Sequence, residues 1–415
     1  MATIQAQTLT DYHSHLITPE YRAALERHGM LLDERFPLPQ WSTESHLAFM
    51  DEVGIAQSIL THPAPHPFFG DQEECNRLCR QFNEQANAIC HESKGRFAFC
   101  AVLPLPDVQA AIREAQYALD TLGAAGVKLA TNVYGQYLGD SVLDPLMAYL
   151  SNRNALVILH PHKPSPVNNA LMQQTPLAMQ GYLSETTNAV CNMISRNVLA
   201  RYPRMRVVVP HCGAYLPIAI PRMKALYPVM RKNGLVGEID FDQNIASLWF
   251  DLAGSPTEGT VNALLTLTSH DHLLYGSDYP YVAPVAVKSI LADLLSRGLV
   301  GTLEGIGNSD RIVRIAEIEV YPQYLSQYLA AAAEIQQRSL AEEPGVICLF
   351  PTQTKEDNCQ IRILEIYASP QAYQHHIQTE HFKQYKQGTL HMVKSLKLQD
   401  LEELTPETMN KIFKR

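Results

Sequence analysis

The sequence has little of what marks membrane, secreted and nucleic-acid-binding proteins. No uncharged apolar run reaches the roughly 18 residues of a membrane-spanning helix, so we expect no membrane segment. The first residues, MATIQAQTLT, have neither the basic segment nor the apolar core of a secretory signal, and we expect a cytoplasmic protein. Basic residues are in the minority, 33 Lys and Arg against 42 Asp and Glu, and they form no cluster. We therefore expect no nucleic-acid partner.

Paired cysteines are also missing. None of the eight cysteines forms a CxxC motif; they are Cys75, Cys79, Cys90, Cys100, Cys191, Cys212, Cys348 and Cys359. Because they are scattered and lie mostly in apolar surroundings, they are typical of reduced, buried thiols. A disulfide framework would show paired spacings.

What the chain does contain is enough apolar sequence for more than one core. Its 415 residues exceed the usual limit for a single core, and 46% of them are hydrophobic. Up to about residue 300, short β-rich runs alternate with helical patterns, which indicates repeated βα units. The eight predicted strands are Leu9–His13, Gln57–His62, Phe97–Leu103, Gly126–Ala130, Ala155–His160, Arg206–His211, Ser247–Leu252 and His272–Ser277. They predict an α/β fold, a (β/α)8 TIM-type barrel, which we place at residues 1–310.

After residue 310 the order of the patterns changes. A period-two strand at 312–320 is followed by a helix at 323–340, strands at 345–350 and 360–367, a helix at about 370–386 and a strand near 391–398. The order β-α-β-β-α-β predicts a small α+β domain with the ferredoxin-like arrangement. We place this second domain at residues 311–415.

Metal-ligand side chains recur where the predicted barrel strands end. They are His13 and His15 on the first strand, His160 and His211 at the ends of the fifth and sixth, and Asp278 after the eighth. By itself the HxH pair could equally be two solvated histidines in an N-terminal loop. However, the active sites of (β/α)8 barrels lie at the carboxyl ends of the strands, and residues i and i+2 of a strand share a face. Together the five side chains predict one metal site.

A set of imidazoles with a single carboxylate suits a divalent transition metal. Zn²⁺ is the ion that we expect, and Mn²⁺ and Fe²⁺ stay open because these ligand types do not separate the three ions. We expect one ion and no organic cofactor.

Six segments of the barrel follow one another in an order typical of a known family. They are 11-DYHSHLITPEY-21, 101-AVLPLPD-107, 158-ILHPH-162, 185-ETTNAVCNMI-194, 207-VVVPHCGAYLP-217 and 275-YGSDYP-280. From residue 9 to about 305 the chain resembles the amidohydrolase superfamily, in the branch of aminocarboxymuconate-semialdehyde decarboxylase and the 6-methylsalicylate decarboxylases. The resemblance implies a mononuclear metal held by His13, His15, His160 and Asp278, with His211 as a nearby acid–base residue.

The same resemblance implies a homodimer or higher homo-oligomer. In this branch an arginine eleven residues after the acid–base histidine crosses a dimer interface to bind the substrate carboxylate, and Arg222 has that spacing. Arg222 could equally be a surface arginine that caps a helix. Arg35 and Trp41, in 33-DERFPLPQW-41, are further candidates for contact with a carboxylate and a ring, although this segment could also be a structural flap.

Two chemistries fit such a centre. The first is non-oxidative decarboxylation of a small aromatic or muconate-type acid, with His211 and Asp278 handling the proton. The second uses metal-bound hydroxide to hydrolyse a lactone, an amide or a carbon–carbon bond. We favour decarboxylation because of the resemblance.

The second domain has motifs of its own, 314-RIAEIEVYP-322, 342-EEPGVICLF-350 and 361-IRILEIYASPQAYQHHIQTEHFKQY-385. They resemble the antibiotic biosynthesis monooxygenase family of small dimeric domains, whose members can oxygenate phenols without metal or flavin. The candidate polar groups are Glu365, Tyr367, His376 and His381. The alternative is a module that pairs chains without chemistry of its own, because these side chains at helical spacing could simply line a packed face.

Overall fold

The computed structural model describes residues 9–33, 36–168, 175–254, 256–297, 299, 312–343, 346–367 and 370–401. The chain divides into two compact units, Met1–Ile290 and Leu291–Arg415. The division falls inside helix α12 (Pro284–Ser296), earlier in the chain than residue 310. A domain boundary at 310 stays a prediction.

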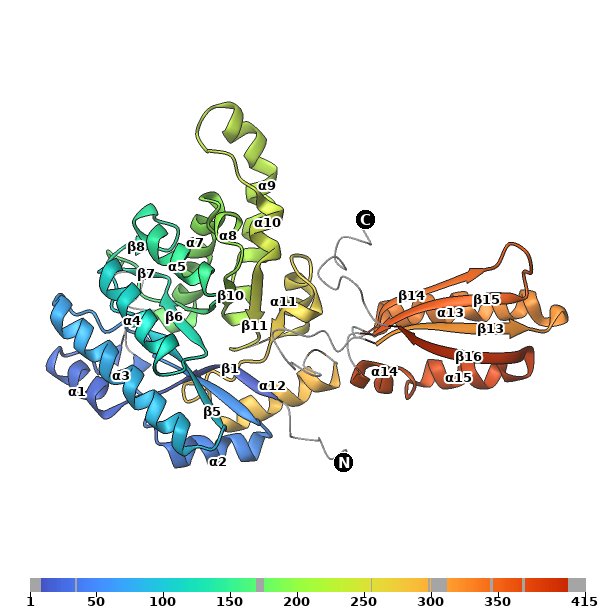
Figure 1. The fold of residues 1–415 in the computed structure, drawn as a ribbon, viewed down its shortest axis with the longest axis horizontal. Coiled ribbons are helices and arrows are strands. Elements are labelled where there is room, and N and C mark those ends of the chain that lie inside the picture. The colour runs from blue at the N-terminus through green and yellow to red at the C-terminus, as the bar shows by residue number, and fades with distance from the viewer. Residues whose placement is uncertain are drawn as a thin grey trace. The chain divides into compact units, whose positions relative to one another are not determined.

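Eight parallel strands form the sheet of the first unit (Figure 1). In spatial order they are β1 (Thr10–His15), β4 (Gln57–Thr61), β5 (Phe97–Val102), β6 (Gly126–Ala130), β9 (Leu156–His160), β10 (Arg206–Val209), β11 (Leu248–Asp251) and β12 (Leu273–Leu274). Beyond β12, the Tyr12 amide donates to the Tyr275 carbonyl at 2.9 Å and the His15 amide to the Tyr279 carbonyl at 2.8 Å. These bonds join the last strand segment to β1, and the predicted (β/α)8 barrel is confirmed.

Helices follow most of the strands. They are α1 (Pro19–Arg27), α2 (Thr43–Val53), α3 (Gln72–Glu92), α4 (Val108–Asp120), α5 (Asp144–Asn152), α7 (Gly181–Ser195), α8 (Val198–Arg201), α9 (Leu216–Lys232), α10 (Phe241–Ala246), α11 (Glu258–Leu264) and α12. Two short hairpins add β2 (Leu32–Asp33) with β3 (Phe36–Pro37), and β7 (Asn132–Val133) with β8 (Gln136–Tyr137). Helix α9 projects away from the barrel (Figure 1).

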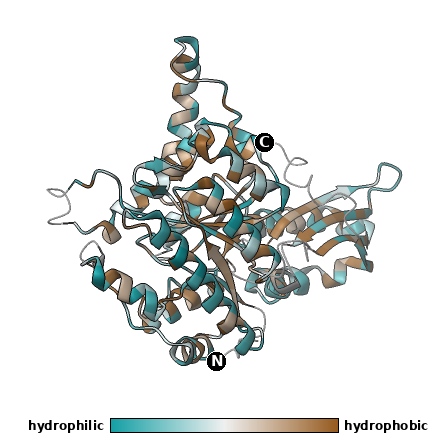
Figure 2. Ribbon diagram, turned by 60° about the vertical axis from the view of Figure 1, so that its left-hand side comes forward, coloured by the Kyte–Doolittle hydropathy of each residue, from teal (hydrophilic) through white to brown (hydrophobic). Residues whose placement is uncertain are grey.

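The barrel forms because its strands are buried along nearly their whole length while its helices are apolar on one side. Strand β9 is buried at every residue, as expected for a parallel strand covered on both faces. In α3, Asp71 caps the first turn, and the apolar residues Leu78, Phe82 and Ala86 on one side of the helix are buried. Figure 2 shows this pattern: hydrophobic strands lie within and the helices carry hydrophilic residues outward.

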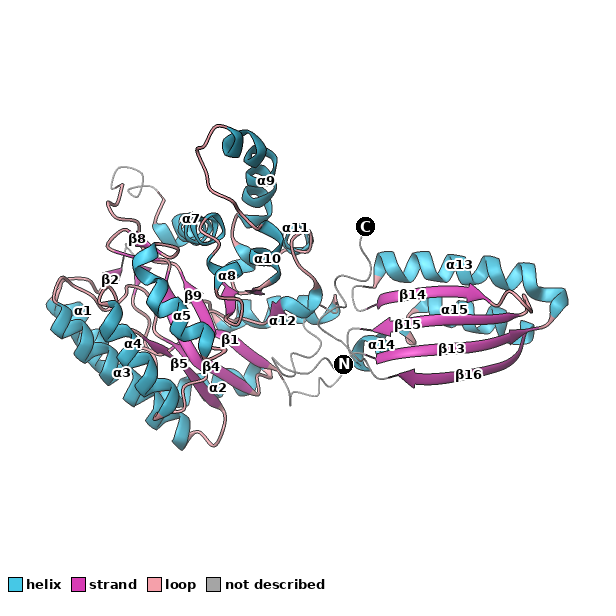
Figure 3. Cartoon of the chain, turned by 45° about the horizontal axis from the view of Figure 1, so that its top comes forward, coloured by secondary structure: helices cyan, strands magenta, loops and turns pink. Residues whose placement is uncertain are grey.

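The second unit is a four-stranded antiparallel sheet with helices, and the predicted ferredoxin-like order is confirmed (Figure 3). Its elements are β13 (Ile312–Val320), α13 (Leu325–Glu342), β14 (Val346–Gln353), β15 (Gln360–Tyr367), α14 (Pro370–His376), α15 (Glu380–Thr389) and β16 (Val393–Leu401). The strand order is β14-β15-β13-β16. Ala316 and Ile318 of β13 pack against Tyr328 and Ala332 of α13, so the core lies between one face of the sheet and the helices.

Among the helices in the described ranges, none combines the length and the apolar character that a membrane crossing requires.

Candidate metal centre

The barrel brings the five predicted side chains to one end of the sheet. His13 and His15 are both in β1, and His160 is the last residue of β9. His211 follows β10, and the Asp278 amide donates to the carbonyl of His13 at 2.8 Å. Because neighbouring strands are parallel, their carboxyl ends meet at this rim.

The distances within the cluster fit a single ion. The rings of His13 and His15 are 5.1 Å apart, and the ring of His160 lies 4.8 Å from that of His15. Candidate ligand atoms of these three histidines all lie within 4.8 Å of one another. Asp278 Oδ1 is 3.6 Å from His13 Nε2 and 3.3 Å from His15 Nε2. Among the residues that the structure describes, these two buried Nε2 atoms have no hydrogen-bond partner, so the donor set fits a divalent metal.

Hydrogen bonds on the far side of each ring fix which nitrogen faces the centre. His13 Nδ1 lies 2.9 Å from Asp251 Oδ2, and His160 Nδ1 lies 2.9 Å from the Pro161 carbonyl. Each bond requires a proton on Nδ1, because neither oxygen can donate. The Thr61 hydroxyl donates to the Ser14 carbonyl at 2.9 Å, so it accepts from His15 Nδ1 at 3.0 Å. In its neutral form, each of the three rings therefore carries its proton on Nδ1 and turns Nε2 toward the centre.

Burial and charge set the protonation of the cluster. Burial lowers the pKa of His15 to about 4, and burial with the neighbouring His15 holds the pKa of His160 well below its usual range. Neutral imidazole is the form that binds a metal. Burial also lowers the pKa of His13, but the carboxylates of Asp251 and Asp278 outweigh it and raise this pKa to about 9. The acidic groups thus favour positive charge at the centre.

Two aspartates that the sequence analysis did not select hold the cluster in place. Asp251, the last residue of β11, is fully buried and bonds both to His13 and, through Oδ1, to the His211 amide at 3.0 Å. Asp11 accepts from the Ser277 amide at 2.9 Å and from the Ser277 hydroxyl at 2.6 Å, which joins β1 to the segment before Asp278. Asp251 also ends an apolar strand at the same rim, so the signal used for the other ligands would have found it.

His211 sits in a backbone turn of unusual conformation. Four consecutive residues have positive φ: His211 (57°), Cys212 (53°), Gly213 (72°) and Ala214 (53°). Glycine is favoured at Gly213 because φ is positive and a Cβ would lie 2.9 Å from Leu264 Cδ1 and 3.1 Å from Phe250 Cδ1. His211 Nε2 lies 3.8 Å from Asp278 Oδ2. The turn therefore places the imidazole of His211 beside the proposed ligands.

A cavity of about 720 Å³ opens above the cluster and includes His160, His211 and Asp278 in its lining. Much of the remaining surface is apolar, with Phe36, Leu38, Met179, Leu183, Ile218 and Val282. Among the described lining residues, Asp278 is the one acidic side chain, and none is a lysine or an arginine.

The first unit matches the amidohydrolase family model over residues 10–298. The chain belongs to the amidohydrolase family. Residues 311–388 match the antibiotic biosynthesis monooxygenase family. Both resemblances found in the sequence are thus confirmed.

The amidohydrolase relatives are decarboxylases. A 6-methylsalicylic acid decarboxylase of Penicillium expansum is 32% identical over 276 residues, covering 65% of this chain and 84% of the relative. A 2-amino-3-carboxymuconate-6-semialdehyde decarboxylase of Dictyostelium discoideum is 24% identical over 295 residues, with 65% and 81% covered. A solved 5-carboxyvanillate decarboxylase of Novosphingobium aromaticivorans, complexed with manganese, shares the fold with a TM-score of 0.62 at 19% identity, over 69% of this chain and 91% of that one. The chain is an enzyme, and its relatives make it a lyase.

The predicted substrate contacts of this amidohydrolase lie outside the cavity lining or outside the described residues. Arg35 is not among the described residues. Trp41 does not line the cavity; it packs against an apolar cluster that includes Tyr21, and its indole N–H donates to His46 Nδ1 at 3.0 Å. Arg222 is exposed on α9 and does not line the cavity of its own chain. Contact of these three residues with substrate stays a prediction.

In the second unit the predicted polar residues form two pairs. The Tyr367 hydroxyl donates to Glu365 Oε2 at 3.2 Å. His376 Nδ1 and His381 Nε2 lie 3.0 Å and 2.6 Å from Glu343 Oε1. Glu343 was not predicted; it follows the last residue of α13, and the sequence pattern gave no sign that it meets two histidines of a later segment.

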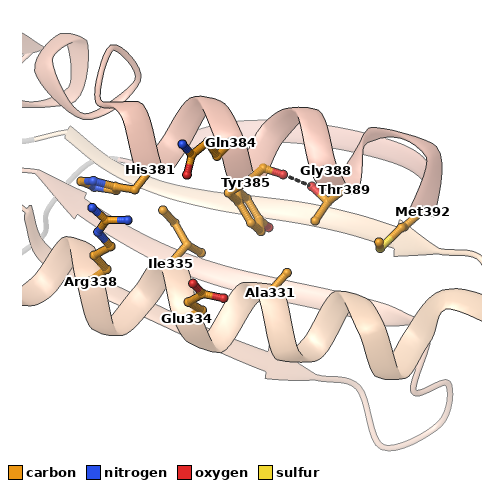
Figure 4. A pocket seen from close by; sticks show the side chains of 10 residues that line it. All are labelled: Ala331, Glu334, Ile335, Arg338, His381, Gln384, Tyr385, Gly388, Thr389 and Met392. Carbon is orange, nitrogen blue, oxygen red and sulfur yellow. Dashed lines mark hydrogen bonds between the residues drawn. The ribbon is translucent and has the colours of Figure 1, made fainter.

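A second, smaller cavity of about 250 Å³ lies between α13 and α15 (Figure 4). Arg338 and Glu334 face it from α13, and His381, Gln384 and Tyr385 face it from α15. Of the four residues predicted for this unit, His381 is the one that lines this cavity.

Proposed function

We propose that the amidohydrolase unit is a metal-dependent, non-oxidative decarboxylase of a small aromatic or muconate-type acid, with a 2-hydroxybenzoate such as 6-methylsalicylate as the first candidate. The observation that carries the proposal is the convergence of His13, His15, His160 and Asp278 beside a largely apolar cavity. The sequence likeness to a 6-methylsalicylic acid decarboxylase supports the substrate class.

For the metal we propose one Zn²⁺ held by His13, His15, His160 and Asp278, with Mn²⁺ as the second ion to test, because a solved decarboxylase of this fold contains manganese. When bound, such an ion supplies a positive charge that holds the carboxylate of the substrate and a neighbouring hydroxyl oxygen. Both groups are present in a 2-hydroxybenzoate.

We assign the proton transfer to His211. Its imidazole lines the cavity, so it can give a proton to the ring carbon that carries the carboxylate. The bond between that carbon and the carboxylate then breaks, its electron pair returns to the ring, and CO₂ leaves. The products are CO₂ and the corresponding phenol, and His211 regains a proton from solvent.

Asp278 contributes to this step through its negative charge beside His211. Burial raises the pKa of Asp278, but the neighbouring imidazoles of His15 and His211 outweigh burial and hold this pKa well below the usual range. The carboxylate therefore stays ionised, and its Oδ2 atom lies 3.8 Å from His211 Nε2, where its charge can attract the imidazole.

The test is CO₂ release from 6-methylsalicylate by full-length protein loaded with Zn²⁺ or Mn²⁺, against the chelated protein as control. Release that depends on the metal is the expected result. If the loaded protein released no CO₂ from hydroxybenzoates or muconate-type acids but hydrolysed a lactone or an amide, the hydrolase alternative would replace the proposal.

We further propose that the active form is a dimer in which Arg222 of one chain binds the substrate carboxylate in the other. The lining of the cavity within one chain has no lysine or arginine among its described residues, although the substrate is an anion. Helix α9, which carries Arg222, projects from the barrel with exposed Leu226 and Val229 (Figure 1). Exposed apolar residues on a projecting helix are typical of an interface.

For the second unit, the observation at hand favours pairing of chains over a separate monooxygenase activity. Phe350, Leu364 and Ile315 are cross-strand neighbours on three adjacent strands. Ile315 alternates with Ala316, whose side chain faces the helices, so these three lie on the opposite face. Phe350 is 57% exposed there. An apolar sheet face of this kind supports a sheet-to-sheet contact between two chains.

A further inference from the structure

The cavity of the amidohydrolase unit is polar at one place and apolar elsewhere. Its charged and imidazole groups, His160, His211 and Asp278, gather at the metal centre. Away from the centre, most of the lining is aliphatic or aromatic, and its side-chain hydroxyls are those of Thr260, Tyr182, Tyr215 and Tyr281. A substrate that fits should therefore present its carboxylate and hydroxyl at one end and mostly hydrocarbon along the rest.

The cavity is also larger than a monomethylated benzoate requires. A volume of about 720 Å³ lies within the ~300–1,000 Å³ typical of pockets for drug-sized ligands. A benzoate with a single methyl group would leave much of the apolar lining in contact with water. Hydrocarbon that replaced this water would add affinity in proportion to the area covered.

Two exposed side chains at the edge of the cavity indicate how far the hydrocarbon part of a substrate could extend. Met179, before α7, and Ile218, on α9, both line the cavity and are nevertheless 72% and 75% exposed. Large exposed apolar side chains that border a binding cavity mark surface that a ligand covers.

We propose that the preferred substrate is an aromatic acid whose ring carries a linear apolar substituent of several carbons, longer than methyl. This inference rests on the proposed decarboxylase function. The carboxylate and hydroxyl occupy the metal centre, and the substituent runs along the apolar lining toward Met179 and Ile218.

The experiment uses full-length, metal-loaded protein and two matched series of compounds. The acids are 2-hydroxybenzoates with methyl, propyl or pentyl at ring carbon 6, and the phenols are the products that the loss of CO₂ would give. CO₂ release yields kcat/KM for the acids, and calorimetric titration yields Kd for the phenols. We expect kcat/KM to rise and Kd to fall about fourfold per methylene, so roughly 15-fold from methyl to propyl, the factor that corresponds to ~0.8 kcal/mol per buried CH₂.

The outcomes separate this inference from the function on which it rests. CO₂ release from the methyl compound, with no gain or a loss for propyl and pentyl, would overturn the inference and leave the decarboxylase proposal intact. Phenol affinity that rises along the series without CO₂ release from any acid would support the selectivity of the cavity and contradict decarboxylation.

Variants locate the effect in the cavity. Ala263→Leu and Ala286→Leu add bulk to the half-buried lining, so the ratio of kcat/KM for the pentyl acid to that for the methyl acid should fall several-fold. Ala246→Leu, at an exposed position of α10 outside the lining, should leave this ratio unchanged. A fall of equal size in all three variants would count against the inference.

Discussion

The carboxylate of Asp251 joins His13 to the backbone of His211. Its Oδ2 atom lies 2.9 Å from His13 Nδ1, and its Oδ1 atom accepts the amide proton of His211 at 3.0 Å and that of Ala253 at 3.1 Å. One buried side chain thus orients a proposed metal ligand and fixes the start of the turn that carries the proposed acid–base residue.

Asp251→Asn should weaken metal binding about 10- to 100-fold, the usual effect of losing such an outer partner. All three groups around Asp251 are donors, and an asparagine amide replaces one acceptor oxygen with a fourth donor. Competition with a chelator of known affinity measures the effect. Asp242→Asn, at a side chain that is 94% exposed, is the matched control. Unchanged affinity in Asp251→Asn would show that this carboxylate does not position the ligand.

Substitution of His13 should remove the metal, whereas substitution of His211 should lower kcat and leave the metal bound. We expect about one Zn²⁺ or Mn²⁺ per chain by elemental analysis, and loss of this metal in the double variant His13→Ala with Asp278→Ala. His211→Asn should keep the metal but lower kcat by roughly 10²- to 10⁴-fold, the range expected for removal of a general acid. His28→Ala, at a surface histidine that pairs with Glu74, should change neither quantity. Metal loss in His211→Asn would make this histidine a ligand.

Arg222 should act in the site of the other chain. Arg222→Ala and His211→Asn should each lose activity alone, whereas a mixed dimer of the two variants should regain part of it. In that dimer one site has both an intact His211 and an intact Arg222. The measurement is CO₂ release after the two variants are mixed and exchanged. Lack of recovery in a mixture shown by mass to contain mixed dimers would contradict the shared site.

The second unit should lose stability in acid through Glu343. Burial raises the pKa of Glu343, but hydrogen bonds with His376 and His381 outweigh it and lower this pKa to about 2. The folded pKa lies below the unfolded value, so the stabilisation is complete above about pH 4.5 and disappears as the pH falls toward 2. Its size is up to roughly 3 kcal/mol.

Calorimetric unfolding of the full chain between pH 5 and pH 3 can test this dependence. The unfolding temperature of the second unit should fall steeply as the pH is lowered in the wild type, and less steeply in Glu343→Gln. Glu342→Gln, at a neighbouring glutamate that is half exposed, is the control and should follow the wild type. If the unfolding temperature depended on pH equally in the wild type and in Glu343→Gln, Glu343 would not be the source of the acid sensitivity.

Phe350→Glu should halve the molecular mass measured by light scattering, because the proposed contact between sheets would bury the new carboxylate. Leu340→Glu introduces the same charge at an exposed position of α13 and should leave the mass unchanged. A wild-type protein that is already monomeric would contradict the pairing role of this unit.

The barrel and most of its candidate centre could be predicted because both depend on local pattern. His160 ends a run of buried residues, and a residue that ends a parallel strand points to the rim whatever the exact register. The bounds were less certain: the first strand runs to His15 and not to His13, and β12 keeps only Leu273 and Leu274 as regular strand.

Two other missed residues, Thr61 and Glu343, depend on contacts that the sequence pattern does not contain. Thr61 fixes the tautomer of His15 because its single proton goes to the Ser14 carbonyl, a choice set by three-dimensional geometry. Glu343 meets His381 across 38 positions of the chain. Such contacts form only after segments that are distant in sequence have packed together, so the sequence pattern does not predict them.

The turn at His211–Ala214 also limits how this enzyme can diverge. Three of its four residues carry a side chain at positive φ, where each non-glycine residue costs about 1–3 kcal/mol and branching at Cβ adds to the cost. Drift at Cys212 and Ala214 is therefore confined to small or unbranched residues, although both positions line the cavity. New substrate preferences are therefore expected from other lining positions, such as Leu183, Ala263 and Ala286, where the backbone is helical.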